Sequence, residues 1–287
     1  MIDSPHSARM LVGKANKHAD RSRFAPQTLF SCADTVALVT GGATGIGAAC
    51  AEALGAAGAA VGIVGLPEPD GERWRGCETP EAAAQRLRRS GIRALGIGSD
   101  ITDSDQLVEA VSGVEAAFGT IDTVVAVAGS SLDGTRDDRL LELDLMYRLN
   151  VRSVVELSDL VLPGMARNGG GSFIVMSSLA GLRGNTELSN YGVTKAANAQ
   201  LARNIAVKWG PENIRANAIS PGVIETEFAQ PITADPERSE TRRGKTPLGR
   251  FGIPAEVAGA VVWLASPAGA FTTGQNIVID GGTVVND

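Results

Sequence analysis

Residues 35–57 read TVALVTGGATGIGAACAEALGAA. The β-branched run Thr35–Thr40 favours a strand, and Ile46–Ala57 places small and apolar residues at helical spacing. Between them lies a glycine-rich turn, Gly41–Gly47, of a kind that permits positive φ and a close approach of the backbone to a phosphate. The amides and the dipole at the start of the following helix stabilise such an anion. A turn of this kind also occurs without a ligand, so the rest of the chain has to distinguish the two readings.

The glycine spacing is Gly-x-x-x-Gly-x-Gly, carried by Gly41, Gly45 and Gly47. It differs from the Gly-x-Gly-x-x-Gly of the general dinucleotide fingerprint, and it lacks the Gly-Lys-Ser/Thr of a P-loop. The strand, turn and helix context nevertheless favours a dinucleotide site.

The remainder of the chain alternates strand and helix patterns. Further strands are predicted at Ala59–Val64, Ile92–Ile97, Ile121–Val127, Ser172–Ser177, Ile214–Ile219 and Gln275–Ile279. Helices are predicted at Pro80–Ser90, Asp103–Phe118, Arg139–Met165, Tyr191–Trp209 and Pro254–Ala265. This alternation predicts an α/β fold, a doubly wound parallel sheet of seven strands with helices on both faces, Rossmann-like. Residues 34–287 are expected to form one domain, and residues 1–33 a flexible extension with at most a weak targeting helix.

Composition excludes several classes of protein. The net charge of −6 disfavours a nucleic-acid partner. No apolar run approaches the ~20 residues that span a membrane, so a cytoplasmic location is expected. The two histidines, His6 and His18, precede the predicted domain, and the three cysteines lack metal spacing. The sequence therefore predicts no metal site and no Ser-His-Asp hydrolase.

A second motif combines a hydroxyl, a phenol and an amine. Tyr191 and Lys195 lie four residues apart on one predicted helix, so their side chains share a face. Ser178 directly follows a predicted buried strand, at the edge of the sheet where ligands bind. A nearby ammonium is expected to lower the pKa of the phenol toward the range useful for proton transfer. A half-buried tyrosine beside a solvated lysine is the plain structural alternative.

Taken together, these motifs resemble those of the short-chain dehydrogenase/reductase family in its single-domain form, from about residue 35 to residue 282. The matching motifs are Thr40–Gly47, Asp100-Ile101, Asn150, Ser178, Tyr191 with Lys195, Pro221–Thr226, Pro247–Gly252 and Thr273–Gly282. The resemblance implies a catalytic set made of Asn150, Ser178, Tyr191 and Lys195. It implies dinucleotide contacts from Gly41, Thr44, Gly45, Ile46, Gly47, Asp100, Ile101, Ala128, Gly129, Tyr191, Lys195, Val223 and Thr226.

The resemblance also implies the chemistry, which is hydride transfer between a secondary alcohol or ketone and nicotinamide. Tyr191 would move the hydroxyl proton, Lys195 would lower its pKa and bind the nicotinamide ribose, and Ser178 would hold the substrate oxygen. Asn150 would anchor a water that links Lys195 to solvent. Two alternatives stay open, a β-ketoacyl carrier reductase and a catalytically idle dinucleotide sensor. A homotetramer or homodimer is also implied.

Two departures from the family pattern bear on the cofactor. After the fourth strand the family usually has Asn-Asn-Ala-Gly, whereas residues 126–129 read Ala-Val-Ala-Gly. The second strand ends in Gly65 and Leu66, without the Asp typical of NAD users or the Arg or Lys typical of NADP users. Thr44 also stands where NADP users often have a basic residue. NAD is therefore the expected cofactor and NADP the alternative, with the ribose contacted by Glu68, Asp70 or Arg73.

Substrate recognition is expected between Ile224 and Phe251, a polar segment long enough to form a lid. Its cations, Arg242, Arg243 and Lys245, could bind an acidic or carrier-bound substrate, although a solvated charge run is the favoured explanation. Candidate pocket residues are Ser130, Ser131, Leu179, Leu182, Leu188 and Phe228.

Overall fold

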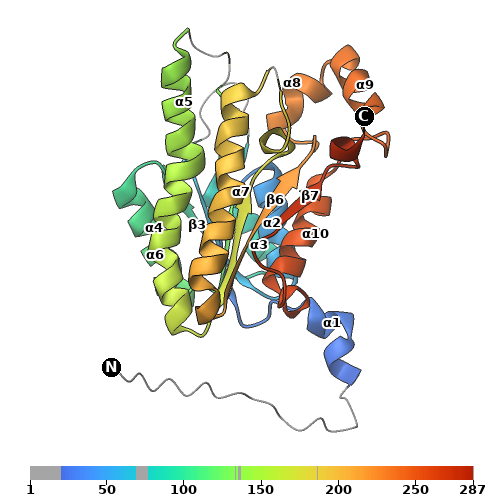
Figure 1. Cartoon of the computed structure of the whole chain (residues 1–287). Helices are drawn as coiled ribbons and strands as arrows, with labels where there is room; N and C mark the ends of the chain where they lie inside the picture. The colour runs from blue at the N-terminus through green and yellow to red at the C-terminus, as the bar shows by residue number, and fades with distance from the viewer. Residues whose placement is uncertain (1–20, 69–76, 133, 135–136, 186, 287) are drawn as a thin grey trace, which may run out of the picture.

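The computed structural model describes residues 21–68, 77–132, 134, 137–185 and 187–286 (Figure 1). Its centre is one parallel sheet with the strand order β3-β2-β1-β4-β5-β6-β7. The strands are β1 (Val36–Thr40), β2 (Ala60–Gly65), β3 (Ala94–Gly98), β4 (Thr123–Ala126), β5 (Gly171–Met176), β6 (Ile214–Pro221) and β7 (Asn276–Ile279). The predicted seven-stranded parallel sheet is confirmed, and the strand ends differ from the prediction by only one or two residues.

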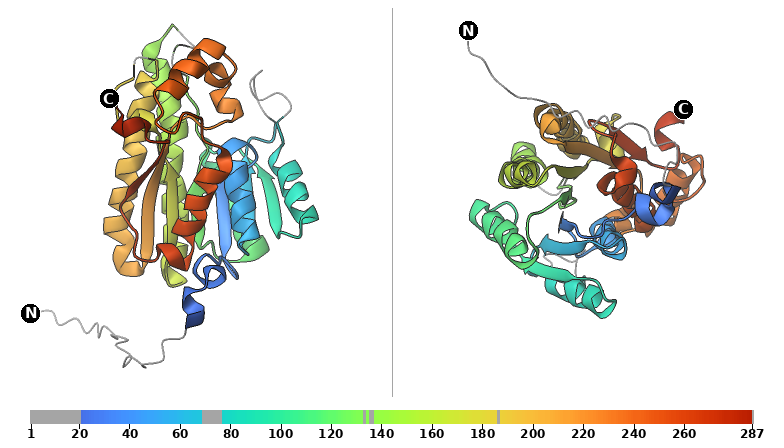
Figure 2. Two further views of the ribbon diagram at one scale, coloured as in Figure 1. Left: turned by 90° about the vertical axis from the view of Figure 1, so that its right-hand side faces the viewer. Right: turned by 90° about the horizontal axis from the view of Figure 1, so that it is seen from below.

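Helices cover both faces of the sheet (Figure 2). One face carries α4 (Ser104–Phe118), α6 (Ser153–Arg167) and α7 (Ser189–Trp209). The other carries α2 (Gly45–Ala56), α3 (Pro80–Arg89) and α10 (Pro254–Ala265). Alternate residues of each strand face opposite helix layers, as a two-residue period requires. In β1, for example, Leu38 joins the α4–α6–α7 core and Val39 joins the other core.

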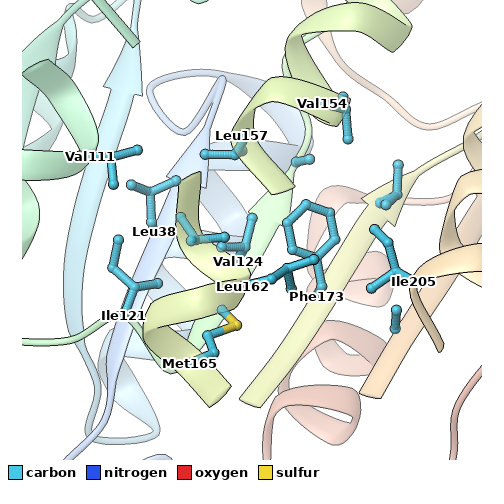
Figure 3. Close-up of a cluster of buried hydrophobic side chains, with 14 of the residues drawn as sticks. Leu38, Val111, Ile121, Val124, Val154, Leu157, Leu162, Met165, Phe173 and Ile205 are labelled. Atoms are coloured by element: carbon cyan, nitrogen blue, oxygen red, sulfur yellow. The ribbon is translucent and has the colours of Figure 1, made fainter. Parts of the chain in front are cut away.

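The α4–α6–α7 core is built on large apolar side chains that are almost fully buried (Figure 3). Phe173 of β5 lies at its centre, beside Leu162 of α6, Val124 of β4 and Ile205 of α7. Burial of this apolar surface is the main stabilising contribution to the fold. It also fixes α6 and α7 against the sheet, and these helices begin at its carboxyl edge, where β1, β4 and β5 end.

The predicted helix Arg139–Met165 is divided in the structure. The α-helix α5 (Arg139–Tyr147) passes into the π-helical turn η3 (Arg148–Arg152), which continues directly into α6. A π turn closes i→i+5 hydrogen bonds, so it is wider than the α-helix around it, and such turns are frequent at functional sites. Asn150 lies within this turn and is fully buried.

The polar segment between Ile224 and Phe251, in which the sequence predicted no helix, is largely helical. It contains the short helices η6 (Glu227–Ala229) and α8 (Gln230–Thr233), followed by α9 (Pro236–Gly244). Asp235 caps α9 by accepting hydrogen bonds from the amides of Glu237 and Arg238, which is the usual role of an N-cap aspartate. In Figure 1, α8 and α9 lie at the end of the molecule where α7 begins.

Part of the predicted extension lies within the described residues. Residues 21–33 contain η1 (Arg21–Phe24) and α1 (Pro26–Leu29), and the Cys32 side chain is buried in the core that includes Leu54. The Cys32 amide donates to the Ala57 carbonyl at 2.8 Å. Residues 1–20 lie outside the described residues, so the boundary at residue 34 stays a prediction. Within the described residues, the helices are too short or too polar to cross a membrane.

Candidate active site

The predicted catalytic side chains meet at the carboxyl edge of the sheet. Ser178 follows β5 and caps the short helix η4 (Leu179–Gly181) by accepting from the Ala180 amide at 3.1 Å. Its hydroxyl also forms a hydrogen bond with the phenol of Tyr191, which lies in the first turn of α7. The ammonium nitrogen of Lys195 lies 5.5 Å from the centre of the Tyr191 ring. The structure therefore brings the hydroxyl, the phenol and the amine together.

Lys195 is held deep in the site. Its side chain is only 3% exposed, and its Nζ donates to the Met176 carbonyl at 3.0 Å. The backbone is fixed as well, because the Ser177 hydroxyl donates to the Lys195 carbonyl at 2.7 Å. Burial favours the neutral amine and lowers the pKa of Lys195 to about 8.

Burial shifts the pKa of Tyr191 in the opposite direction from that of Lys195. Burial raises the pKa of its phenol to about 12, and the hydrogen bond from Ser178 lowers that pKa by a smaller amount. The sequence had predicted a lowered pKa from the neighbouring amine, and that prediction is wrong for the protein alone. The reason is that removal of the phenol from water disfavours the phenolate more than the surrounding polar groups stabilise it. The Phe228 ring adds to this burial, with its centre 5.9 Å from that of Tyr191.

Asn150 is anchored by three hydrogen bonds. Its Oδ1 accepts from the Ser130 amide at 2.9 Å, and its Nδ2 donates to the Ser130 carbonyl at 2.9 Å and to the Thr194 hydroxyl at 3.0 Å. A Cβ placed on Gly129 would lie 2.8 Å from Asn150 Oδ1 and 3.0 Å from Lys195 Nζ. The asparagine and the lysine therefore converge on one point, which only a glycine leaves free. The water relay expected of Asn150 stays a prediction.

The glycine turn lies directly beside this cluster. Gly41 and Gly45 adopt positive φ of 66° and 49°, where glycine is favoured. A Cβ on Gly41 would lie 2.8 Å from the Ala128 amide nitrogen, so the turn packs on the same Ala128-Gly129 segment that contacts Asn150 and Lys195. Gly47 packs on the backbone of Gly41, which keeps the turn tight.

The turn is suited to a dinucleotide. Thr44 is the N-cap residue of α2, but its side chain makes no capping hydrogen bond, and the first turn of α2 contains no acidic residue. The amides at this helix terminus therefore donate no hydrogen bond to the Thr44 hydroxyl, and such a terminus favours the binding of a phosphate. The amides belong to Thr44, Gly45, Ile46 and Gly47. The residues present fit the cofactor that the sequence predicts.

The predicted adenosine contacts lie at the next strand ends. Asp100 and Ile101 follow β3; the Asp100 carboxylate accepts from the Thr102 amide at 2.9 Å, and Ile101 is buried. At the end of β2, a Cβ on Gly65 would meet, among the described residues, only Pro80 Cγ at 3.7 Å and Gly41 Cα at 4.0 Å. These described neighbours leave room for a side chain.

Other candidate ribose contacts are placed only in part. Leu66 and Glu68 are exposed. Asp70 and Arg73 lie outside the described residues.

The turn after β6 approaches the glycine turn from the other side. The Thr226 methyl lies 3.1 Å from the Cβ position of Gly45, and its hydroxyl donates to the Ile224 carbonyl at 3.3 Å. Val223 is partly buried in the same turn. The predicted contacts from residues 41–47, 128–129 and 223–226 thus form one continuous surface.

The basic residues of α9 face the segment that leads to Tyr191. Arg238 forms an ion pair with Glu187 at 2.9 Å, and Arg242 approaches the same carboxylate at 3.9 Å. Arg243 lies over the Phe251 ring at 5.9 Å. The sequence predicted cations here but missed Glu187 and Arg238, because a contact across 51 residues leaves no local pattern.

The remaining pocket candidates differ in exposure. Leu179 is buried, and Leu182 is 41% exposed. Ser130, Ser131 and Leu188 are partly buried. No group of three or more metal-ligating side chains is found within the part of the chain that the structure describes.

The buried amine makes a testable contribution to stability. In the unfolded chain Lys195 keeps its ordinary pKa of 10.5, whereas the folded value is about 8. Between these values the unfolded state binds more protons, so this group makes stability rise with pH. Lys195→Met removes this pH dependence. The free energy of unfolding of the variant minus that of wild type is therefore expected to be larger near pH 7 than near pH 10. Urea unfolding at both values measures the difference.

The matched control is Lys208→Met, an exposed lysine on the same helix. The difference in free energy of unfolding between Lys208→Met and wild type is expected to be the same near pH 7 and near pH 10. If the Lys195 variant shows the same flat behaviour, burial does not lower the pKa of this amine.

Comparisons with known proteins agree with this geometry. Residues 41–284 match the family model described as "Enoyl-(Acyl carrier protein) reductase". The chain is 36% identical to the sorbose reductase of Candida albicans, over 88% of each chain. Its fold is similar to a 7α-hydroxysteroid dehydrogenase complexed with NADH and 7-oxo glycochenodeoxycholic acid, with TM-score 0.80, 30% identity, and 88% and 95% of the two chains covered. It is also similar to a gluconate 5-dehydrogenase of Burkholderia cenocepacia in complex with NADP and tartrate, with TM-score 0.81, 29% identity, and 91% and 99% covered.

Proposed function

The chain belongs to the short-chain dehydrogenase/reductase family, and from this premise we propose that Asn150, Ser178, Tyr191 and Lys195 form its active site. It is an NAD(P)-dependent oxidoreductase that acts on an alcohol or a ketone, as its relatives do. The observation that carries the assignment is that a hydroxyl, a phenol and an amine lie together, with the amine against the Gly129 segment on which the glycine turn packs. That arrangement joins a proton donor to a dinucleotide site.

Each side chain has a defined task in the proposed reaction. The bound nicotinamide supplies or accepts the hydride. Tyr191 gives its phenolic proton to the oxygen of a ketone, or accepts a proton from an alcohol in the reverse direction. Ser178 donates a hydrogen bond to the same oxygen and holds it near the phenol. Lys195 stabilises the phenolate that forms when the proton leaves, because an adjacent ammonium favours the anion.

Asn150 is a positioning residue in the proposed site. It fixes the Ser130 backbone and Thr194, which in turn donates to the Tyr191 carbonyl at 2.8 Å. The π turn that carries Asn150 is thus linked to the helix that carries Tyr191 and Lys195.

The test of this function combines binding and turnover. Titration with NADH and NADPH, followed by oxidation or reduction of a panel of alcohols and ketones at the nicotinamide absorbance, is expected to show turnover with one cofactor. Binding without turnover on any carbonyl or alcohol would favour the dinucleotide sensor instead. A rate that depends on a carrier protein would favour the β-ketoacyl carrier reductase, the substrate class that the cations of α9 suit.

We further propose NAD as the preferred cofactor. The described end of β2, residues 65–68, contains no basic residue to pair with a 2′-phosphate. Relatives bind NADH or NADP, so the preference rests on this chain's own residues.

An aspartate at Gly65 tests where the ribose is recognised. Gly65→Asp is expected to raise the ratio of NADH affinity to NADPH affinity by about tenfold or more, because a carboxylate accepts from the 2′-hydroxyl and repels a 2′-phosphate. The position has ordinary φ and room for the side chain. Fluorescence titration with both cofactors measures the ratio, and Gly65→Asn is the uncharged control. An unchanged ratio would mean that the ribose is recognised elsewhere.

A homotetramer or homodimer is proposed as the assembly. Apolar side chains lie exposed on helices α5 and α7 and near β7, where another copy would cover them. They are Leu140, Tyr147, Val193, Val207, Phe271 and Val278. Sedimentation measures the mass of the assembly, and a monomer at micromolar concentration would contradict the proposal. The cytoplasmic location stays a prediction of the sequence.

A further inference from the structure

Glu227 is the first residue of η6, and its carboxylate lies against the glycine turn. A Cβ on Gly45 would lie 3.3 Å from Thr226 Cβ and 3.6 Å from Glu227 Oε2. That oxygen is buried and accepts no hydrogen bond from the part of the chain that the structure describes. A buried carboxylate oxygen without a partner is unfavourable in itself, so its position beside the turn needs a physical reason.

The start of α2 supplies an attraction. Its free amides and its dipole place partial positive charge at Gly45, and neither a Thr44 side-chain cap nor an acidic residue in the first turn compensates it. A carboxylate nearby is stabilised by this field. The same field is what attracts the pyrophosphate of a dinucleotide. Glu227 and the pyrophosphate are therefore two anions drawn to one positive helix end.

The charge of Glu227 also acts on Cys77, which lies ahead of α3. The pKa of the Cys77 thiol is raised, first by burial and then by the negative charge of Glu227. Cys77 precedes α3, whose first residue, Pro80, lies beside Gly65. The charge of Glu227 thus acts on the turn after β6, on the glycine turn and on the residues that lead into α3.

We propose that the carboxylate of Glu227 opposes the pyrophosphate of a dinucleotide bound at the glycine turn and so sets the affinity of the chain for its cofactor. This inference rests on the proposed function, because it requires a dinucleotide at that turn. Glu227 contributes repulsion rather than a contact. A change to glutamine keeps its shape and removes the charge.

The adjacent residue gives this position a second consequence. Phe228, next to Glu227 in η6, lies against the Tyr191 ring. The short helix η6 therefore contacts the glycine turn through Glu227 and the phenol ring through Phe228.

The experiment compares the full-length chain with Glu227→Gln and with the matched control Glu225→Gln. Glu225 is exposed and lies two residues earlier. Calorimetry measures the binding of NADH and of ADP-ribose, which both contain a pyrophosphate. Displacement of NADH by adenosine measures the binding of a ligand without a pyrophosphate. Glu227→Gln is expected to bind NADH and ADP-ribose on the order of fivefold more tightly. This is the size of effect expected when a repulsion between two partly exposed charges is removed. Its affinity for adenosine is expected to stay unchanged.

Salt provides a second readout. Screening weakens the repulsion, so the gain of Glu227→Gln is expected to be smaller at about 0.5 M sodium chloride than at about 0.05 M. If Glu227→Gln does not fold, Glu227→Ala is measured in its place, with the same expected gain. Unchanged or weaker NADH binding, or an equal gain in Glu225→Gln, would overturn the role of Glu227. Absence of binding of both NADH and NADPH by wild type and all variants would instead overturn the proposed function.

Discussion

Tyr191→Phe is expected to lower kcat by about 10² to 10⁴-fold, the range by which a positioned general acid or base accelerates a reaction. The phenylalanine ring keeps the packing against Phe228 and removes only the hydroxyl that bonds to Ser178. NADH affinity is therefore expected to remain close to that of wild type. Steady-state rates with the best substrate of the panel, together with NADH titration, measure the two quantities separately.

Tyr147→Phe is the matched control, because Tyr147 is the only other tyrosine of the chain and is 51% exposed on α5. Its kcat is expected to equal that of wild type. Retention of most activity by Tyr191→Phe would remove the phenol from the proton transfer, whatever the relatives do. Loss of NADH binding in the same variant would show that the change had damaged the site as a whole.

The raised pKa of Tyr191 determines the protonation state of the phenol that Tyr191→Phe removes. A phenol with a pKa of about 12 is protonated at neutral pH, so the protein alone presents a proton donor. The folded pKa lies above the ordinary value of 10, so this group's contribution to stability is complete below pH 10 and is lost as pH rises through 12.

Local patterns predicted most of the fold and part of the site. The strands follow from apolar and β-branched runs, and the shared face of Tyr191 and Lys195 follows from a spacing of four on a helix. The glycine turn is likewise a continuous piece of sequence. These features depend on neighbours along the chain, so a single sequence contains the information.

Other features depend on distant parts of the chain. The π turn at Asn150 contains no Gly or Pro to interrupt the helical pattern, so the sequence predicted one continuous helix. The placement of Phe228 on Tyr191 and of Glu227 on Gly45 results from how the segment after β6 folds back over the sheet. The pKa of Tyr191 depends on that same cover. A spacing of residues predicts which groups meet, and tertiary packing decides how much water remains around them.

Gly129→Ala is expected to lower kcat by about 10²-fold, because a displacement of reacting groups by about 1 Å costs this much. The new methyl would lie 2.8 Å from Asn150 Oδ1 and 3.0 Å from Lys195 Nζ, closer than normal contacts. Asn150 cannot yield easily, since it is fully buried and held by Ser130 and Thr194. The lysine must therefore shift from the Met176 carbonyl, or the segment that carries Gly129 must move. Steady-state kinetics and urea unfolding measure the result, with an expected loss of about 1–3 kcal/mol in stability from overpacking.

Gly184→Ala controls for the change of glycine to alanine in the segment between Ser178 and Tyr191, because a Cβ there meets no atom of the described residues within 4 Å. It is expected to leave kcat at the wild-type value. Gly129 has an ordinary φ, so strain of the backbone would not explain a loss of activity in Gly129→Ala, and only the contact with Asn150 and Lys195 would. Wild-type kcat in that variant would mean that the point shared by the two side chains plays no part in turnover. A loss of kcat with NADH affinity retained would place the damage at the proton-transfer groups rather than at the dinucleotide, since the methyl meets Asn150 and Lys195 before anything on the glycine turn.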